Sequence, residues 1–221
     1  MSERTLHRLL WGILLLVLAV VVGTGVWSGL GSGLKREQGE PGQRVLEGLE
    51  RFGTVPDFSL TERSGRRLSL AELKGKIWIA NFIYTSCKDT CPLQSAAMAR
   101  LQGDLARREN LRLVSISVDP EHDNPKTLSR YAERFHADRE FWLFLTGERE
   151  AIRRLAQEGF HLSAVPAPDR VGESGPIILH SSRFVLVDGR ARIRGYYDSQ
   201  DAEALQRLRQ DVKELFRETE A

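Results

Sequence analysis

Apolar runs alternate with amphipathic segments over most of the chain. Residues 76–84 (KIWIANFIY) and 111–119 (LRLVSISVD) are compact and largely apolar, as strands buried on both faces of a parallel sheet must be. Apolar residues at helical spacing follow each run, which predicts helices over residues 92–108 and 127–135. Pro92 suits the first turn of the first helix, because that position needs no N–H donor. The pattern therefore predicts two successive strand–helix units.

The later part of the chain predicts one more strand and helix, then a hairpin and a closing helix. The dipeptide Asp188-Gly189 separates the last two strands and is a strong signal for a tight turn. The expected elements are strands over 141–147, 182–188 and 191–198 and helices over 148–160 and 201–218. The resulting order, β-α-β-α-β-α-β-β-α, predicts an α/β fold, a thioredoxin-like sandwich with a central mixed sheet and right-handed crossovers.

A segment near the N-terminus can span a membrane. Residues 9–27 (LLWGILLLVLAVVVGTGVW) carry no formal charge, and a helix of about 20 residues crosses a hydrocarbon core of ~30 Å. Trp11 and Trp27 lie near its two ends, where aromatic side chains prefer the membrane interface. A cleaved signal peptide is the main alternative, but no small-residue cleavage site follows the apolar run. We therefore expect one transmembrane helix.

This segment divides the chain into a tail, an anchor, a tether and a domain. Residues 1–8 form a short basic tail, which we expect to stay in the cytoplasm. Basic residues lie on both sides of the anchor at 9–27, so the count of positive charges alone does not decide its orientation. Gly and charged residues dominate 28–47, as is typical of a flexible tether. Residues 48–221 form the folded domain on the periplasmic or extracytoplasmic side. Nothing upstream resembles a mitochondrial presequence, so we expect a bacterial cytoplasmic membrane.

Composition narrows the class of protein further. Hydrophobic residues make up 41% of the 221 residues and charged residues 28%, which excludes a wholly disordered chain and a polytopic membrane protein. The formal charge is +2 and no run concentrates Lys and Arg, so nucleic acid is not expected as a partner. A chain of this length needs no disulfide staples, and its two cysteines both fall in one short motif.

Cys87 and Cys91 lie in SCKDTCP, directly after the first predicted strand. Open α/β sheets bind ligands at this end of their strands, so the motif is well placed for function. Because a helix N-terminus favours thiolate over thiol, we expect a low thiol pKa at Cys91 and at Cys87. The two sulfurs could converge on one metal ion or close a disulfide. A purely structural pair is the remaining alternative, although so short a loop adds little stability.

Two sulfurs are too few for a closed zinc site, so further ligands must come from elsewhere in the chain. The histidines expected to be ordinary surface residues are His7, His122, His136 and His161. His180 differs because it lies just before the strand at 182–188, where a neighbouring strand could bring it over the cysteine loop. From the residues alone, a structural histidine and a metal ligand are equally supported at this position.

Three segments together resemble a known family. They are the segment that ends in SCKDTCP, the segment SISVDPEHDNP and the segment LHSSRFVLVDGRARIRGYYD. Cys-x-x-x-Cys-Pro, Val-Asp-Pro-x-x-Asp and a late His before a strand occur in this order in the Sco/SenC family. Its members are membrane-anchored, thioredoxin-fold copper proteins needed to assemble the copper site of cytochrome c oxidase. The resemblance covers residues 50–217 and the N-terminal anchor.

The resemblance implies that Cys87, Cys91 and His180 bind copper. Two thiolates and an imidazole also suit copper chemically, and a site with few ligands on an exposed loop favours transfer over storage. The implied function is a copper metallochaperone that delivers copper to the cytochrome c oxidase subunit carrying the copper site. An upstream copper donor or a thiol reductant is a further expected partner. For Asp119 and Asp123, which match the Val-Asp-Pro-x-x-Asp element, we expect a structural role.

Two enzymatic functions remain as alternatives. A thiol-disulfide reductase would use Cys87 and Cys91 to keep the oxidase copper-site cysteines reduced. Such reductases resemble one another in a proline just before the strand that faces the dithiol, whereas this chain has His180-Ser181-Ser182 there. A peroxidase has less support, because YTSCKD lacks the Thr-x-x-Cys element that peroxiredoxins share. SCKDTCP also lacks the Pro that often follows the first Cys in the Sco/SenC family, which affects partner preference but leaves the ligands intact.

Overall fold

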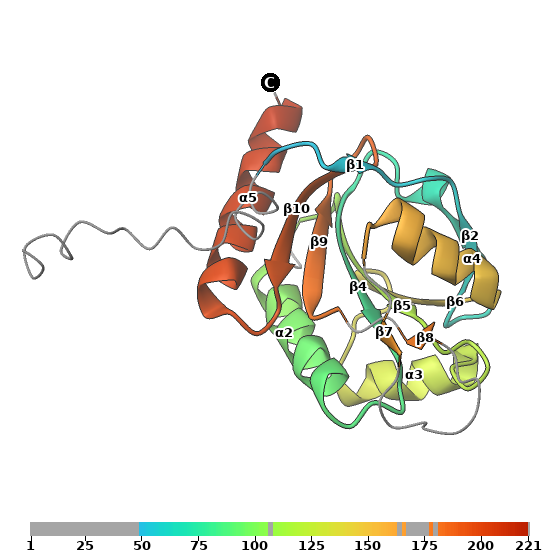
Figure 1. The fold of residues 1–221 in the computed structure, drawn as a ribbon. Helices are drawn as coiled ribbons and strands as arrows, with labels where there is room; N and C mark the ends of the chain where they lie inside the picture. The colour runs from blue at the N-terminus through green and yellow to red at the C-terminus, as the bar shows by residue number, and fades with distance from the viewer. Residues whose placement is uncertain (1–48, 106–107, 163–164, 167–176, 179–180, 221) are drawn as a thin grey trace, which may run out of the picture. The chain divides into compact units, whose positions relative to one another are not determined.

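The described residues build an eight-stranded mixed sheet at the centre of the fold (Figure 1). This computed structural model describes residues 49–105, 108–162, 165–166, 177–178 and 181–220. In spatial order the strands are β1 (Gly53–Thr54), β10 (Arg192–Asp198), β9 (Arg183–Val187), β4 (Ile77–Ile83), β5 (Leu111–Ser117), β6 (Trp142–Thr146), β2 (Ser59–Glu62) and β3 (Arg67–Ser69). Strands β4, β5 and β6 are parallel, and the other pairs in this sheet are antiparallel. The predicted α/β fold with a mixed sheet is confirmed.

The parallel strands β4 and β5 lie at the two apolar runs that the sequence analysis identified as buried strands. All seven positions of β4 are buried, which explains why its sequence shows no alternation between apolar and polar residues. The short strands were not predicted. Besides β1, they are the hairpin of β2 and β3 and a separate antiparallel pair, β7 (Val165–Pro166) and β8 (Ile177–Ile178). Two to four residues per strand give too little periodicity to recognise.

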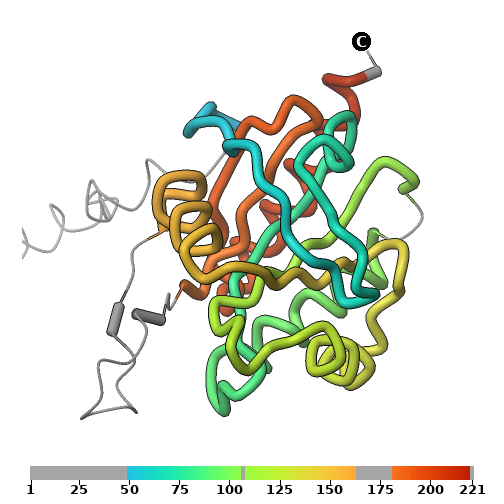
Figure 2. Tube along the Cα trace, turned by 90° about the vertical axis from the view of Figure 1, so that its right-hand side faces the viewer, coloured from blue at the N-terminus to red at the C-terminus, as the bar shows by residue number. Residues whose placement is uncertain are grey.

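Helices cover both faces of the sheet. They are α2 (Thr90–Leu105), α3 (Pro125–Arg134), α4 (Arg149–Arg154), a π-helical turn η3 (Leu155–Gly159), α5 (Ala202–Glu220) and a short 3₁₀ turn η2 (Leu70–Glu72). Contacts place α2 beside α3 and α5: the Ser95 and Tyr131 hydroxyls lie 2.9 Å apart, and Arg209 pairs with Asp104 at 2.7 Å. Helix α4 lies on the other side of the sheet from α3 (Figure 2). The helix predicted over 148–160 is thus an α-helix that continues as a π-helix.

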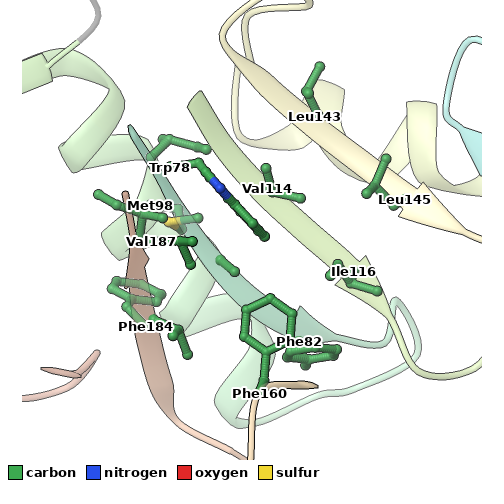
Figure 3. Packing of buried hydrophobic residues seen from close by; sticks show 14 of the residues in the cluster. Trp78, Phe82, Met98, Val114, Ile116, Leu143, Leu145, Phe160, Phe184 and Val187 are labelled. Carbon is green, nitrogen blue, oxygen red and sulfur yellow. The ribbon is translucent and has the colours of Figure 1, made fainter. Parts of the chain in front are cut away.

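The core under α4 is built around one aromatic side chain. The fully buried ring of Phe160, which directly follows η3, packs edge-on against Trp78 and Phe82, with ring centroids 5.8 and 5.3 Å apart (Figure 3). The hydroxyl of Tyr196 donates to the carbonyl of Phe160 at 3.1 Å, which fixes the chain at this point. Because Phe82 is the penultimate residue of β4, this packing supports the strand end that leads into the cysteine loop.

A buried arginine joins the two ends of the folded domain. Arg194, on β10, is 5% exposed, and its guanidinium donates to the carbonyl of Leu49 at 3.1 Å and to the Glu218 carboxylate at 2.9 and 3.0 Å. The same group lies 3.3 Å from the Asp188 carboxylate at the β9–β10 turn. One cation therefore ties the N-terminal segment, the last hairpin and the end of α5 to each other.

The predicted tail, anchor and tether, residues 1–8, 9–27 and 28–47, lie outside the described residues. Within the part of the chain that the structure describes, no helix combines the length and the apolar character needed to cross a membrane.

Candidate metal and dithiol site

Cys87 lies on the loop between β4 and α2, at the carboxyl end of the strand, and Cys91 is the second residue of α2. Both are free thiols and both are buried, with 8% and 5% of their surfaces exposed. Helix α2 begins at Thr90 and does not reach back to Cys87, yet the backbone N–H of Cys91 donates to the Cys87 sulfur at 3.4 Å. The backbone N–H of Cys87 in turn donates to the carbonyl of Tyr84 at 3.2 Å. The loop therefore brings both cysteines to the start of the helix.

The two thiols differ strongly in acidity. Burial works against ionisation of Cys87, but backbone N–H groups of Cys91 and Asp89 donate to its sulfur and hold its pKa below the ordinary value. Burial raises the pKa of Cys91 to about 12, and a negative charge on Cys87 adds to this effect. The prediction of a low pKa thus agrees with Cys87 and is wrong for Cys91, because burial there outweighs the field of the helix N-terminus.

A buried carboxylate holds the beginning of the cysteine loop. Asp123 is fully buried and accepts hydrogen bonds from the backbone N–H of Thr85 at 3.0 Å, the Thr85 hydroxyl at 2.5 Å and the Ser117 hydroxyl at 2.6 Å. Thr85 is two residues before Cys87. Asp119 is also buried, and its carboxylate lies 2.8 Å from Nδ1 of His122. The contacts of Asp123 connect the end of β5 to the cysteine loop, whereas the contact of Asp119 stays within the segment after β5. Both sets of contacts agree with the structural role expected for the two aspartates.

The chain just before β9 lies against the helix that carries Cys91. Gln94, three residues after Cys91 and 1% exposed, donates its side-chain amide to the carbonyl of Ser181 at 2.6 Å. A cavity of about 270 Å³ lies beside this hydrogen bond. The described residues that line it are Phe82, Thr90, Cys91, Gln94, Ser181, Ser182 and Gln200. The structure therefore brings Ser181 and Cys91 to the same cavity.

The predicted third ligand, His180, lies outside the described residues, as does His7. The side chain of His122 is 56% exposed, and His136 and His161 are exposed as well, which agrees with their prediction as surface residues. Among the described residues, no three or more His, Cys, Asp and Glu side chains are grouped so that they could hold a metal ion. The ligand assignment of Cys87, Cys91 and His180 remains a prediction.

Sequence reasoning missed the side chains that support this site. Thr85 and Ser117 were not singled out, and Gln94 was not recognised either. A weak signal existed for Gln94: it is a polar residue three positions after Cys91 and therefore on the same face of a helix whose other residues there are largely apolar.

Comparison with known proteins identifies the family of the chain. The SCO1/SenC family model matches residues 47–217, which is most of the chain and all but the last three of the described residues. The chain belongs to the SCO1/SenC family. It is 32% identical over 173 residues to the SCO1 protein homolog of Bacillus subtilis (strain 168), covering 78% of this chain and 86% of that protein. The predicted family is confirmed.

Solved Sco structures support the same conclusion. The chain superposes on BsSco, a member of the Sco family of cytochrome c oxidase assembly proteins in which a disulfide switch was identified, with a TM-score of 0.65, 32% identity and coverage of 78% and 98% of the two chains. It also matches Bradyrhizobium japonicum ScoI with copper bound, with a TM-score of 0.56, 25% identity and coverage of 72% and 99%. The predicted thioredoxin-like fold is confirmed by these matches.

Proposed function

We propose that this protein is a copper metallochaperone for cytochrome c oxidase. In this proposal Cys87, Cys91 and His180 hold copper as the cargo, and the recipient is the oxidase subunit that carries the copper site. A helix over residues 9–27 anchors the domain, residues 48–221, to the outer side of a bacterial cytoplasmic membrane. An upstream donor protein loads the site with copper, or a thiol reductant keeps its two cysteines reduced. Family membership supports the assembly role, and the copper-bound ScoI supports the cargo.

The observation that carries the copper proposal is the Gln94–Ser181 hydrogen bond. It holds Ser181 against the helix that begins with Cys91, across a shared cavity. In the sequence, Ser181 directly follows the proposed ligand His180. Two thiols and an imidazole are soft and borderline donors, which suit copper far better than Mg²⁺ or Ca²⁺.

The test measures copper binding by the reduced full-length protein. We expect one copper per chain in the wild type. Cys87→Ala, Cys91→Ala and His180→Ala should each weaken binding by more than the roughly 10- to 100-fold expected for loss of an outer-shell partner. His136→Asn is the control, because His136 is exposed and asparagine tolerates its left-handed backbone, at φ 51°. Copper affinity unchanged in His180→Ala would refute the histidine assignment.

A second candidate function, thiol-disulfide reductase, is favoured by the difference between the two thiols. Reduction begins when one thiolate attacks a partner disulfide, and a second thiol then releases the partner. Cys87, with its lowered pKa, suits the attacking role, and Cys91 lies close enough for its N–H to contact the Cys87 sulfur. The disulfide switch reported for BsSco supports this candidate as well.

Oxidase activity in cells separates the two functions. In cells lacking the protein we expect low oxidase activity at limiting copper and partial recovery when copper is added, because a higher ion concentration offsets a missing delivery step. Reduction needs only Cys87 and Cys91, whereas delivery also needs His180. His180→Ala should therefore behave like the deletion. Full rescue of oxidase activity by His180→Ala at low copper would reject the chaperone in favour of the reductase.

A further inference from the structure

His122, on the loop after β5, is oriented by a buried carboxylate. We propose that this histidine is an accessory copper ligand, whose Nε2 atom binds copper from solution before Cys87 and Cys91 receive it. The accessory site consists only of described residues, whereas the transfer to the cysteines rests on the proposed function.

The contact with Asp119 fixes both the orientation and the proton of the imidazole. Nδ1 of His122 lies 2.8 and 3.0 Å from the two carboxylate oxygens of Asp119, which is 1% exposed. An ionised carboxylate only accepts hydrogen bonds, so Nδ1 carries the proton and Nε2 of the neutral ring keeps its lone pair. Histidines that bind metals almost always donate their other ring N–H in this way, and the contact makes the ligating nitrogen more basic. With more than half of its side chain exposed, His122 is also accessible to an ion in solution.

The other described histidines provide an internal comparison. His136 and His161 are exposed as well, but neither ring forms a hydrogen bond with another described residue. Their imidazoles therefore gain neither a fixed orientation nor added basicity from a carboxylate. Exposure alone does not distinguish the three histidines, whereas the contact with Asp119 singles out His122.

The accessory site has one protein ligand, and water completes the coordination of the ion. The neighbouring Glu121 pairs with Arg149, so we assign it no role as a ligand. Imidazole suits copper, and Cu(II) binds nitrogen donors more tightly than the other common divalent ions of its series do. A site with one protein ligand also releases its ion readily, as a transient site requires.

The loop that carries His122 is joined to the start of the cysteine loop. Strands β4 and β5 are parallel neighbours, so the loops that follow them lie at the same end of the sheet (Figure 1). Asp123, the next residue after His122, accepts a hydrogen bond at 3.0 Å from the N–H of Thr85, two residues before Cys87. During transfer, thiolate sulfurs replace Nε2 and water on the copper ion, the thiol protons pass to the solvent, and the oxidation state of copper stays the same.

The first test removes the proposed cysteine–histidine ligand set and asks whether copper still binds. The background is the full-length protein with Cys87→Ser, Cys91→Ser and His180→Ala. We expect it to bind one Cu(II), and pulsed electron paramagnetic resonance should show coupling to one imidazole. Adding His122→Asn should lower the Cu(II) affinity by at least about 10-fold. Unchanged affinity would overturn the proposal.

His136→Asn and His161→Asn are the matched controls in the same background. Both positions have φ 51°, which asparagine tolerates, so neither change strains the backbone. Each should change the Cu(II) affinity by less than about twofold, because neither residue contacts the site. Equal losses at all three positions would mean that exposed histidines bind copper without distinction, and this would overturn the proposal.

The second test concerns Asp119. Asp119→Asn removes the negative charge and nearly keeps the shape of the side chain, and it should lower the Cu(II) affinity of the same background by roughly 10-fold. Should this variant not fold, nitrogen-15 chemical shifts of the His122 ring in the wild type give the same information without copper. We expect the neutral ring to carry its proton on Nδ1. A proton on Nε2, or Asp119→Asn binding as tightly as the background, would overturn the proposal.

The rate of copper loading tests the transfer. When the reduced wild type is mixed with limiting Cu(II), the thiolate-to-Cu(II) absorption bands should appear, and in His122→Asn they should appear roughly 10-fold more slowly with the same final intensity. Equal rates would overturn the accessory role and leave the chaperone function standing. If the wild type shows no such bands, the proposed function itself fails, whereas Cu(II) binding by the background still tests His122 independently.

Discussion

Alkylation should distinguish Cys87 from Cys91 in the reduced, metal-free protein. The perturbation is a brief pulse of iodoacetamide at pH 8. Only the thiolate reacts with this reagent, so the rate at each cysteine follows its thiolate fraction. The two residues are almost equally buried, at 8% and 5% exposure, so access alone does not predict a large difference. The difference should come from acidity.

The expected ratio of rates follows from the two pKa values. With a pKa of about 12, Cys91 is roughly 10⁻⁴ thiolate at pH 8. A thiol at the ordinary value of 9.0 is roughly one tenth thiolate at pH 8, and the pKa of Cys87 lies below that value. The fractions thus differ by at least about 10³-fold. The more basic thiolate is intrinsically more nucleophilic by about 15- to 30-fold, which leaves Cys87 faster by at least about 30-fold.

The sequence provides a direct assay. Lys88 lies between the two cysteines, so trypsin places Cys87 and Cys91 on different peptides. After the pulse, the protein is denatured and the remaining thiols are labelled with isotopically heavy reagent, and mass spectrometry then gives the extent of reaction at each cysteine. The rate at Cys91 should rise about tenfold per pH unit between pH 8 and pH 11, because its thiolate fraction does so.

A protein unfolded in urea is the control, because both cysteines should then react at similar rates. Equal rates in the folded protein at pH 8, or faster reaction at Cys91, would refute the reasoning. Such a result would mean that burial of Cys91 does not suppress its ionisation.

Three further predictions concern stability, each measured by urea unfolding. Asp123→Ala leaves three buried or half-buried donors without their carboxylate and should lower the free energy of unfolding by about 2–4 kcal/mol. Phe160→Ala empties the space against Trp78 and Phe82 and should cost about 3–5 kcal/mol. Burial opposes ionisation of Asp188, but hydrogen bonds from Arg192 hold its pKa below the usual value. The ionised Asp188 carboxylate therefore stabilises the folded protein above the unfolded pKa of about 3.9, and this stabilisation is lost as the pH falls through the lower folded pKa. Arg192→Ala should reduce that loss of stability.

Matched controls are available for each of these variants. Asp138→Ala removes an exposed aspartate that also accepts two backbone hydrogen bonds, and it should cost far less than Asp123→Ala. Phe135→Ala removes a ring that is only partly buried. Arg190→Ala removes an exposed arginine close to Asp188 and should leave the loss of stability between pH 7 and pH 3 unchanged. A variant that changes stability no more than its control would contradict the corresponding prediction.

The strands and helices that were predicted from the sequence are those in which burial determines the pattern of apolar residues. Strands β4 and β5 are buried on both faces, so their apolar runs were recognisable, and the closing helix α5 shows a clear apolar face. The change from α-helix to π-helix after Arg154 was not predicted, because five residues give too little periodicity to distinguish the two helix types. The hairpin of β2 and β3 was missed because its strands are short and partly exposed.

The site was predictable only in part. The sequence predicted that two thiols come together at the carboxyl end of the first long strand, and the structure places Cys87 and Cys91 there. The unequal acidity of the two thiols depends on how deeply each sulfur lies and on which N–H groups point at it, and neither is encoded in the motif. The contacts from Asp123 to Thr85 and from Gln94 to Ser181 join segments 38 and 87 residues apart. A single sequence gives no indication of such pairs, because they arise from the topology of the sheet.

Arg194 brings the two ends of the folded domain close together. Its guanidinium donates to the Leu49 carbonyl and the Glu218 carboxylate at 3.1 and 3.0 Å, so the first and last described segments meet at one point. A short linker could join them covalently with little loss of chain entropy, and the chain could then be opened elsewhere, for example in the exposed turn between β2 and β3. Such a circular permutant would carry its chain ends at a different point of the surface while the sheet and the cysteine loop stay unchanged.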